Sequence, residues 1–163
     1  KDLFKKYDSL EKFAAADLKE LERDIHSTGF YHNKAKNIIA CANTLVTKYG
    51  GEVPSSIEDL TSLAGVGRKT ANVIQAVIFQ KARMAVDTHV FRVSHRLGLV
   101  SDKCTTPLSV EKELVKHIPE NLIPMAHHWL ILHGRYVCLA RRPKCEECGL
   151  LHFCPKNGVK LLS

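Results

Sequence analysis

Four of the six cysteines in the sequence lie close together, and their spacing is typical of a metal site. These four clustered cysteines are Cys138, Cys145, Cys148 and Cys154, with the pattern C-x6-C-x2-C-x5-C. No secretory signal pattern is present to favour two disulfides, so thiolate ligands for zinc or for an iron–sulfur cluster are the stronger alternatives. Zinc ribbons usually pair two C-x2-C knuckles, and this sequence has one. The spacing therefore favours an iron–sulfur cluster.

A second chemical feature is the segment LAGVGRKT at residues 63–70, which separates two predicted helices. Gly65 and Gly67 allow a tight reversal in which the backbone N–H groups of residues 65–68, including those of Val66 and Arg68, can bind a phosphate together with the N-terminus of the next helix. A P-loop is excluded, because that motif needs glycine directly before its lysine, where this chain has Arg68. The alternative is a flexible connector that binds nothing.

Lys69 and Asp87 are candidate catalytic residues, although each also has a purely structural interpretation. Lys69 is predicted in the first turn of a helix, directly after Arg68. The positive end of the helix dipole and the charge of Arg68 both disfavour its ammonium form. A neutral amine can attack a sugar carbon and form a Schiff base, whereas most lysines at helix starts are solvated surface charges. Asp87 is predicted to cap the next helix, where an ionised carboxylate can orient an amine or stabilise a developing sugar cation.

Helical periodicity runs along nearly the whole chain, and capping residues, glycines and prolines mark where helices start and stop. We predict helices at residues 10–16, 18–26, 33–50, 55–63, 68–79, 88–98, 107–117 and 124–134. Sustained two-residue alternation is absent from the sequence, so strands are not expected. The sequence predicts an all-α bundle that is followed by a loop-rich metal module at residues 138–154.

The charge balance favours a polyanionic partner. The chain has 24 lysines and arginines against 17 aspartates and glutamates, which gives a net charge of +7 and favours nucleic acid over a membrane surface. No apolar run approaches the roughly 18 to 20 residues needed to cross a bilayer. Arg141, Arg142 and Lys144 lie between the first two clustered cysteines. They predict a loop that contacts DNA phosphate, and the alternative is a solvated charged loop.

Four features together resemble the helix-hairpin-helix DNA glycosylases, specifically the endonuclease III family. They are LAGVGRKTANVI (63–74), AVDTHVFRVSHRLGL (85–99), HHWLILHGRYVCLARRPKC (127–145) and the spacing of the four clustered cysteines, in the family's order. The resemblance implies an all-α helix-hairpin-helix glycosylase bundle with a C-terminal four-cysteine iron–sulfur loop. Residues 1–106 would form the part with the six-helix barrel and the hairpin, and residues 107–163 the C-terminal helices and the cluster module.

The resemblance also implies the roles of individual residues. Lys69 falls on the family's Schiff-base lysine, Asp87 on its catalytic aspartate, and the four clustered cysteines on the ligands of a [4Fe-4S] cluster. The segment Gly65 to Gly67 falls on the hairpin that grips phosphate, and Phe30 on an apolar residue that wedges into the duplex. The lysine implies a bifunctional enzyme that removes oxidised pyrimidines and then cleaves the strand by β-elimination.

The expected partner is double-stranded DNA with damaged bases or abasic sites, with no membrane association, and the expected state is a monomer. Free clustered cysteines indicate a reducing, intracellular compartment, which is the cytoplasm or nucleoid if the source is bacterial. Two other functions stay open at this point. One is a mismatch- or purine-specific glycosylase on the same fold, against which Lys69 argues, and the other is a DNA-binding module without enzyme activity.

One departure from the family concerns the start of the chain. Family members usually begin with several dozen more residues, which include a helix that packs in the barrel and a Ser-Ala-Gln segment whose glutamine fills the gap left by the extruded base. No such segment precedes Lys1 in this sequence. We therefore expect either a shortened product or an incomplete barrel, in which apolar surface of the neighbouring helices is exposed.

Overall fold

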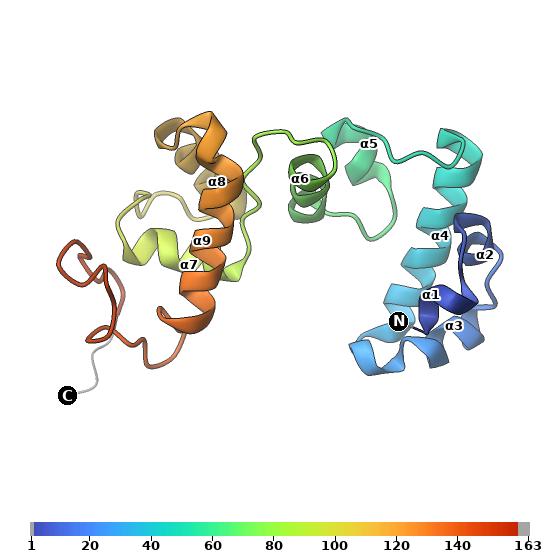
Figure 1. The fold of residues 1–163 in the computed structure, drawn as a ribbon, viewed down its shortest axis with the longest axis horizontal. Coiled ribbons are helices and arrows are strands. Elements are labelled where there is room, and N and C mark those ends of the chain that lie inside the picture. Colours follow the sequence, from blue (N-terminus) through green and yellow to red (C-terminus); the bar gives the residue numbers. More distant parts are fainter. Residues whose placement is uncertain (1, 160–163) are drawn as a thin grey trace. The chain divides into compact units, whose positions relative to one another are not determined.

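The computed structural model describes residues 2–159, and the regular secondary structure in this range is helical (Figure 1). The helices are α1 (Leu3–Lys6), α2 (Leu10–Ala14), α3 (Leu18–Asp24), α4 (Tyr31–Tyr49), α5 (Ile57–Ser62), α6 (Arg68–Val77), α7 (Thr88–Arg96), α8 (Pro107–His117) and α9 (Ile123–Tyr136), with 3-10 turns at η1 (His26–Thr28) and η2 (Glu120–Leu122). The all-α prediction is confirmed. The chain divides into two compact units, Lys1–Ala71 and Asn72–Ser163. The domain boundary expected between residues 106 and 107 stays a prediction.

Local capping chemistry sets where most helices begin. Ser9, Asp17, Ser56 and Asp87 each accept a hydrogen bond from a backbone N–H group in the first turn of the helix that follows. Helix α8 begins at Pro107, a residue that lacks the N–H group which a helix start leaves unbonded. All of these starts are predictable from sequence, since a cap and its partner lie within a few residues of each other.

Helix α4 begins two residues earlier than predicted. Gly29 has φ 65°, and Phe30 adopts the left-handed conformation with φ 49° and ψ 29°. The chain therefore turns before Tyr31, and Phe30, not Asn33, is the residue that precedes the helix. Helix α1 was not predicted, because a single turn is too short to produce a periodic pattern.

In the first unit, α2 and α3 pack on α4, and a network of polar groups ties α1 to α3. The ring of Tyr7, which is buried, stacks on Phe13 with a centroid distance of 4.9 Å. The Tyr7 hydroxyl donates to Asp24 at 3.0 Å, and Lys6 Nζ donates to the same carboxylate at 2.6 Å. These bonds close the unit around α4, the helix that carries Phe30 at its start.

In the second unit, α7 packs against α9 over a core of apolar side chains. The buried members of this core are Met84, Val86, Val90, Val93, Val100, Cys104, Val110, Leu114, Ile123, Ala126 and Leu130. Apolar side chains on another face of α9, including Met125, Trp129 and Leu132, remain exposed. Within residues 2–159, no helix has both the length and the apolar composition that crossing a membrane requires.

We expect that replacing Asp24 with asparagine lowers the thermal stability of the protein at neutral pH. The hydrogen bond from Lys6 lowers the pKa of Asp24 in the folded state. Its contribution to stability is therefore present above the unfolded-state pKa of about 3.9 and is lost as the pH falls through the folded-state pKa. The difference in Tm between wild type and Asp24→Asn should shrink between pH 7 and about pH 3.

Thermal unfolding followed by circular dichroism at both pH values measures this difference. Asp2→Asn is the control, because the side chain of Asp2 is 94% exposed and its ion pair with Lys5, three residues on, is a surface pair. An equally large effect of Asp24→Asn at both pH values would show that the ion pair is not the cause.

Candidate functional site

The connection between α5 and α6, residues 63–67, is a tight turn packed against α4. Gly65 has φ +76°, and a Cβ atom at this position would lie 2.9 Å from the Cβ of Asn37 on α4. The backbone conformation and the close approach of α4 therefore both require glycine at position 65. The amide of Val66 donates to the carbonyl of Leu63 at 3.1 Å, which closes the turn.

Gly67 differs from Gly65, because nothing inside the chain requires glycine there. Its φ is not positive, and a Cβ atom would meet no other atom within 4 Å. Gly67, Arg68 and Lys69 are all exposed, directly at the start of α6. The start of this helix therefore presents an open stretch of backbone, to which an anion such as a phosphate can approach closely.

Phe30 combines an unusual backbone conformation with almost complete exposure. Its side chain is 89% exposed, and its left-handed conformation is costly for a residue with a side chain. Phe30 precedes Asn37 by seven positions, so about two turns of α4, or roughly 10 Å, separate it from the residue that contacts Gly65. An aromatic ring held in water in this way is available to contact another molecule.

Lys69 and Asp87 each lie at the start of a helix. Lys69 is in the first turn of α6 and is exposed. Asp87 caps α7, and its Oδ1 accepts hydrogen bonds from the amides of His89 and Val90, both at 2.8 Å. Since both bonds end on one oxygen, the cap fixes the carboxylate without using Oδ2. Lys69 belongs to the first unit and Asp87 to the second.

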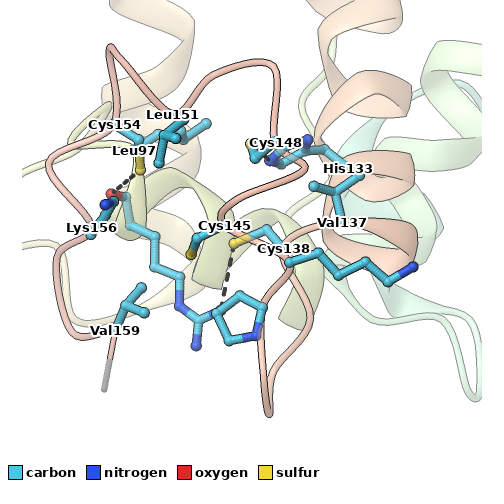
Figure 2. A pocket seen from close by; sticks show the side chains of 13 residues that line it. Leu97, His133, Val137, Cys138, Cys145, Cys148, Leu151, Cys154, Lys156 and Val159 are labelled. Atoms are coloured by element: carbon cyan, nitrogen blue, oxygen red, sulfur yellow. Dashed lines mark hydrogen bonds between the residues drawn. The ribbon is translucent and has the colours of Figure 1, made fainter. Parts of the chain in front are cut away.

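The four clustered cysteines line one pocket in the second unit, which we call the cysteine pocket (Figure 2). Its wall also includes His133, Val137 and Leu151. All six cysteines lie within residues 2–159, and each is a free thiol. The interpretation of the cluster of cysteines as two disulfides is therefore not supported.

The donor set of the cysteine pocket, four free thiols, fits an iron–sulfur cluster, whose irons are held by cysteine thiolates. Four thiolates can also hold a tetrahedral zinc ion, so the donor set alone admits both groups.

Two arginines on α7, which were not predicted as functional from the sequence, fix the chain around the cysteine pocket. Arg92 Nη2 donates to the carbonyl of Gly134 at 2.7 Å and to the carbonyl of Cys138 at 3.1 Å. Arg96 binds the chain just after Cys138 in the same manner. The two arginines are four positions apart, so they share one face of the helix, and this spacing was the available sequence signal.

His133 lies beside another of the clustered cysteines. Its Nε2 is 3.8 Å from the Sγ of Cys148. Burial lowers the pKa of His133 below its usual value, because the charged form loses solvation. Burial therefore favours the neutral imidazole beside the Cys148 sulfur.

The predicted basic loop forms an exposed turn that is fixed at its base. Arg141, Arg142 and Lys144 are all exposed, and Arg142 has φ 52°. The amide of Lys144 donates to the carbonyl of Val137 at 3.0 Å, which closes the loop. Three cationic side chains are therefore carried by one ordered turn beside the cysteine pocket.

Comparison with known proteins gives matches over both units. Residues 1–120 match the HhH-GPD superfamily of base excision DNA repair proteins, and residues 138–154 match the iron-sulfur binding domain of endonuclease III. Endonuclease III of Rickettsia felis is 47% identical over 163 residues, which cover 100% of this chain and 76% of the relative. Endonuclease III of Bacillus subtilis is 49% identical over 160 residues, which cover 98% and 72% of the two chains.

A solved structure of a trapped endonuclease III–DNA covalent intermediate is also similar. It has 48% sequence identity and a TM-score of 0.89, and the match covers 94% of this chain and 72% of that chain.

The match to the iron-sulfur binding domain begins at Cys138 and ends at Cys154, the first and last of the clustered cysteines. The expected cofactor, a [4Fe-4S] cluster, is confirmed. By fold, by the cysteine module and by sequence identity over nearly its whole length, the chain belongs to the endonuclease III family of base excision DNA repair proteins.

Proposed function

We propose that Lys69 and Asp87 are the catalytic residues of this chain. The chain is a base-excision-repair DNA glycosylase with an associated AP (abasic-site) lyase activity, which acts on oxidised pyrimidines through a Schiff base. The observation that carries the assignment is the covalent DNA complex of a relative with 48% identity. A Schiff base to the sugar needs a primary amine on the protein, and Lys69 is an exposed amine next to the hairpin.

The reaction begins with the damaged nucleotide out of the base stack, because the sugar C1′ cannot be reached inside the duplex. Lys69 Nζ attacks C1′ as the bond from C1′ to the base breaks, and the base leaves with a proton. The nitrogen then forms a double bond to C1′ as the bond from C1′ to the ring oxygen O4′ breaks and O4′ takes up a proton, which leaves a protonated imine. The carboxylate of Asp87 supports activation of the amine and stabilises positive charge on the sugar. Loss of a proton from C2′ then breaks the bond from C3′ to its phosphate oxygen, which is the lyase step.

The hairpin and Phe30 are the proposed contacts to the DNA backbone and to the gap in the stack. Gly67 and Arg68 are exposed residues at the start of α6, where backbone N–H groups can bind a phosphate. The exposed ring of Phe30 can enter the space between bases, where it replaces the stacking of the extruded base. Both features lie in the first unit and are linked through α4.

The four clustered cysteines are the proposed ligands of the [4Fe-4S] cluster. When bound, the cluster joins the four thiolates into one rigid centre, and it supplies no atom that reacts with the base or the sugar. The ligands bind as thiolates, so loading the cluster releases protons. The chain's own contribution is to present the basic loop, with Arg141, Arg142 and Lys144, in a fixed shape.

The chain binds DNA, as its endonuclease III relatives do in their DNA complexes. The proposed form of the partner is duplex DNA with damaged bases or abasic sites, bound by one copy of the chain. The proposed location is the bacterial cytoplasm or nucleoid, where free thiols and DNA occur together.

We expect that Lys69→Ala abolishes covalent capture of DNA. Borohydride reduces the imine between an amine and the sugar, so the wild type should form a stable complex with a duplex that contains an oxidised pyrimidine, and the variant should give only background. Gel electrophoresis of the reduced mixtures measures the complex. Lys19→Ala, an exposed lysine on α3, is the control and should trap like the wild type. A wild type that binds the duplex but never traps would instead indicate a DNA-binding module without enzyme activity.

We expect Gly67→Ala to weaken DNA binding and Gly65→Ala to lower the stability of the fold. Gly67→Ala should leave Tm unchanged, because its Cβ meets no atom of the described chain. It should weaken duplex binding by roughly tenfold, because the added methyl group keeps a phosphate too far from the backbone N–H groups for a charge-assisted hydrogen bond. Gly65→Ala should lower stability by about 1–2 kcal/mol through backbone strain, in addition to the approach to Asn37. Thermal unfolding and fluorescence anisotropy measure the two properties. Wild-type affinity in Gly67→Ala would overturn the assignment of the hairpin to phosphate.

We expect that replacing Arg141, Arg142 and Lys144 with alanine weakens binding to damaged and undamaged duplexes alike. Phosphate contacts carry no sequence information, and the removal of each cation that neutralises a phosphate should flatten the plot of log affinity against log salt by about 0.9. Binding titrations between about 50 and 200 mM salt measure the slope. A slope equal to that of the wild type would contradict the phosphate contacts and indicate a solvated charged turn.

A further inference from the structure

The side chain of Arg96 binds three consecutive residues at the start of the cysteine segment. Its Nη1 donates to the carbonyl of Leu139 at 2.6 Å, and its Nη2 donates to the carbonyl of Ala140 at 3.1 Å. Nη1 also lies 3.5 Å from the Sγ of Cys138, in hydrogen-bond geometry. One guanidinium therefore contacts the first clustered cysteine and fixes the two residues that precede the basic loop.

The main chain of the same residue contacts the other end of the cysteine segment. The carbonyl of Arg96 lies 3.4 Å from the Sγ of Cys154 and accepts a hydrogen bond from the amide of Asn157 at 3.3 Å. The side chain of Asn157 donates to the neighbouring carbonyl of His95 at 3.2 Å. The first clustered cysteine and the chain just after the last one are thus both held at the end of α7. The bonds from Asn157 do not need the thiol proton that Cys154 loses when it becomes a cluster ligand.

Helix α7 also connects this contact to the proposed catalytic carboxylate. Asp87 caps the start of the helix, and Arg96 is its last residue. Nine helical residues at about 1.5 Å each span roughly 13 Å. The core side chains Val90 and Val93, both fully buried, hold the helix between these ends. A change at Arg96 can therefore affect the cluster without altering the bonds that cap Asp87.

We infer that Arg96 is a positioning residue for the [4Fe-4S] cluster, which clamps both ends of the cysteine segment to α7 and donates a cationic hydrogen bond to the sulfur of Cys138. This inference rests on the proposed assignment of the four clustered cysteines as ligands. Hydrogen bonds to ligand sulfurs and nearby charge set the reduction potential of such a cluster. A cation at a sulfur stabilises the form that carries one more electron, so Arg96 raises the potential.

The test compares three variants of the cluster-loaded chain. Arg96→Gln removes the charge and most of the hydrogen bonds, and Arg96→Lys keeps the charge but lacks the planar fork. Arg135→Gln is the matched control, because it removes an exposed arginine on α9 three positions before Cys138. Iron analysis gives the cluster content, redox titration followed by electron paramagnetic resonance gives the midpoint potential, and visible absorbance in air gives the rate of bleaching.

The midpoint potential should move to more negative values in Arg96→Gln, and bleaching should become several-fold faster. Arg96→Lys should lie between this variant and the wild type in both measurements, while Arg135→Gln should match the wild type. If Arg96→Gln does not load iron, the midpoint potential and the bleaching rate of the Arg96→Lys protein test the role of Arg96 instead.

Two results would overturn the role of Arg96. One is a loaded Arg96 variant with the potential and bleaching rate of the wild type, and the other is an equal shift in Arg135→Gln, which would indicate net charge and not the hydrogen bond. A full cluster in Cys138→Ser would have a different meaning. That result would overturn the ligand assignment itself, whatever the behaviour of Arg96.

Discussion

The cap of helix α7 by Asp87 is the interaction on which the proposed chemistry most depends. One oxygen of the carboxylate accepts two backbone N–H bonds at 2.8 Å, so the side chain has a fixed position at the start of the helix. A solvated aspartate on a loop would lack this fixed position. The same residue thus starts a helix and holds a negative charge where a sugar cation is proposed to develop. These two roles do not compete, because the cap leaves Oδ2 out of its bonds.

In the first unit, the hairpin backbone and the ring of Phe30 must both stay exposed if they are to contact DNA. Asn37 of α4 packs so closely on Gly65 that the hairpin cannot move toward the helix, while the space around Gly67 stays open. Phe30 keeps its ring in water at the start of the same helix. Elsewhere in the unit, the bonds of Lys6 and Tyr7 to Asp24 join the chain of α1 to α3.

Features with a local signal were predictable from the sequence. The caps at Ser9, Asp17, Ser56 and Asp87 act on amides two or three residues away, and the starts of their helices were predictable for that reason. The start of α4 was misplaced, because the left-handed conformation of Phe30 is a property of its backbone and has no pattern of residue types.

The roles of Arg92 and Arg96 could not be predicted for the opposite reason, since their partners are distant in the sequence. The carbonyls that they bind around the cysteine pocket lie 42 to 46 positions further along the chain. From residue types alone, an arginine on a short helix in a basic chain is expected to be solvated. The four clustered cysteines were predictable as a set from their spacing, but the way α7 holds the first and the last of them needed the three-dimensional structure.

The central claim is that the amine of Lys69 forms the covalent bond to deoxyribose. The most direct measurement is to trap the wild-type chain on a damaged duplex with borohydride, digest both protein and DNA, and locate the sugar remnant by tandem mass spectrometry. We expect the added mass on the peptide that contains Lys69. A remnant found on another lysine, or on the amine at the start of the chain, would contradict the claim.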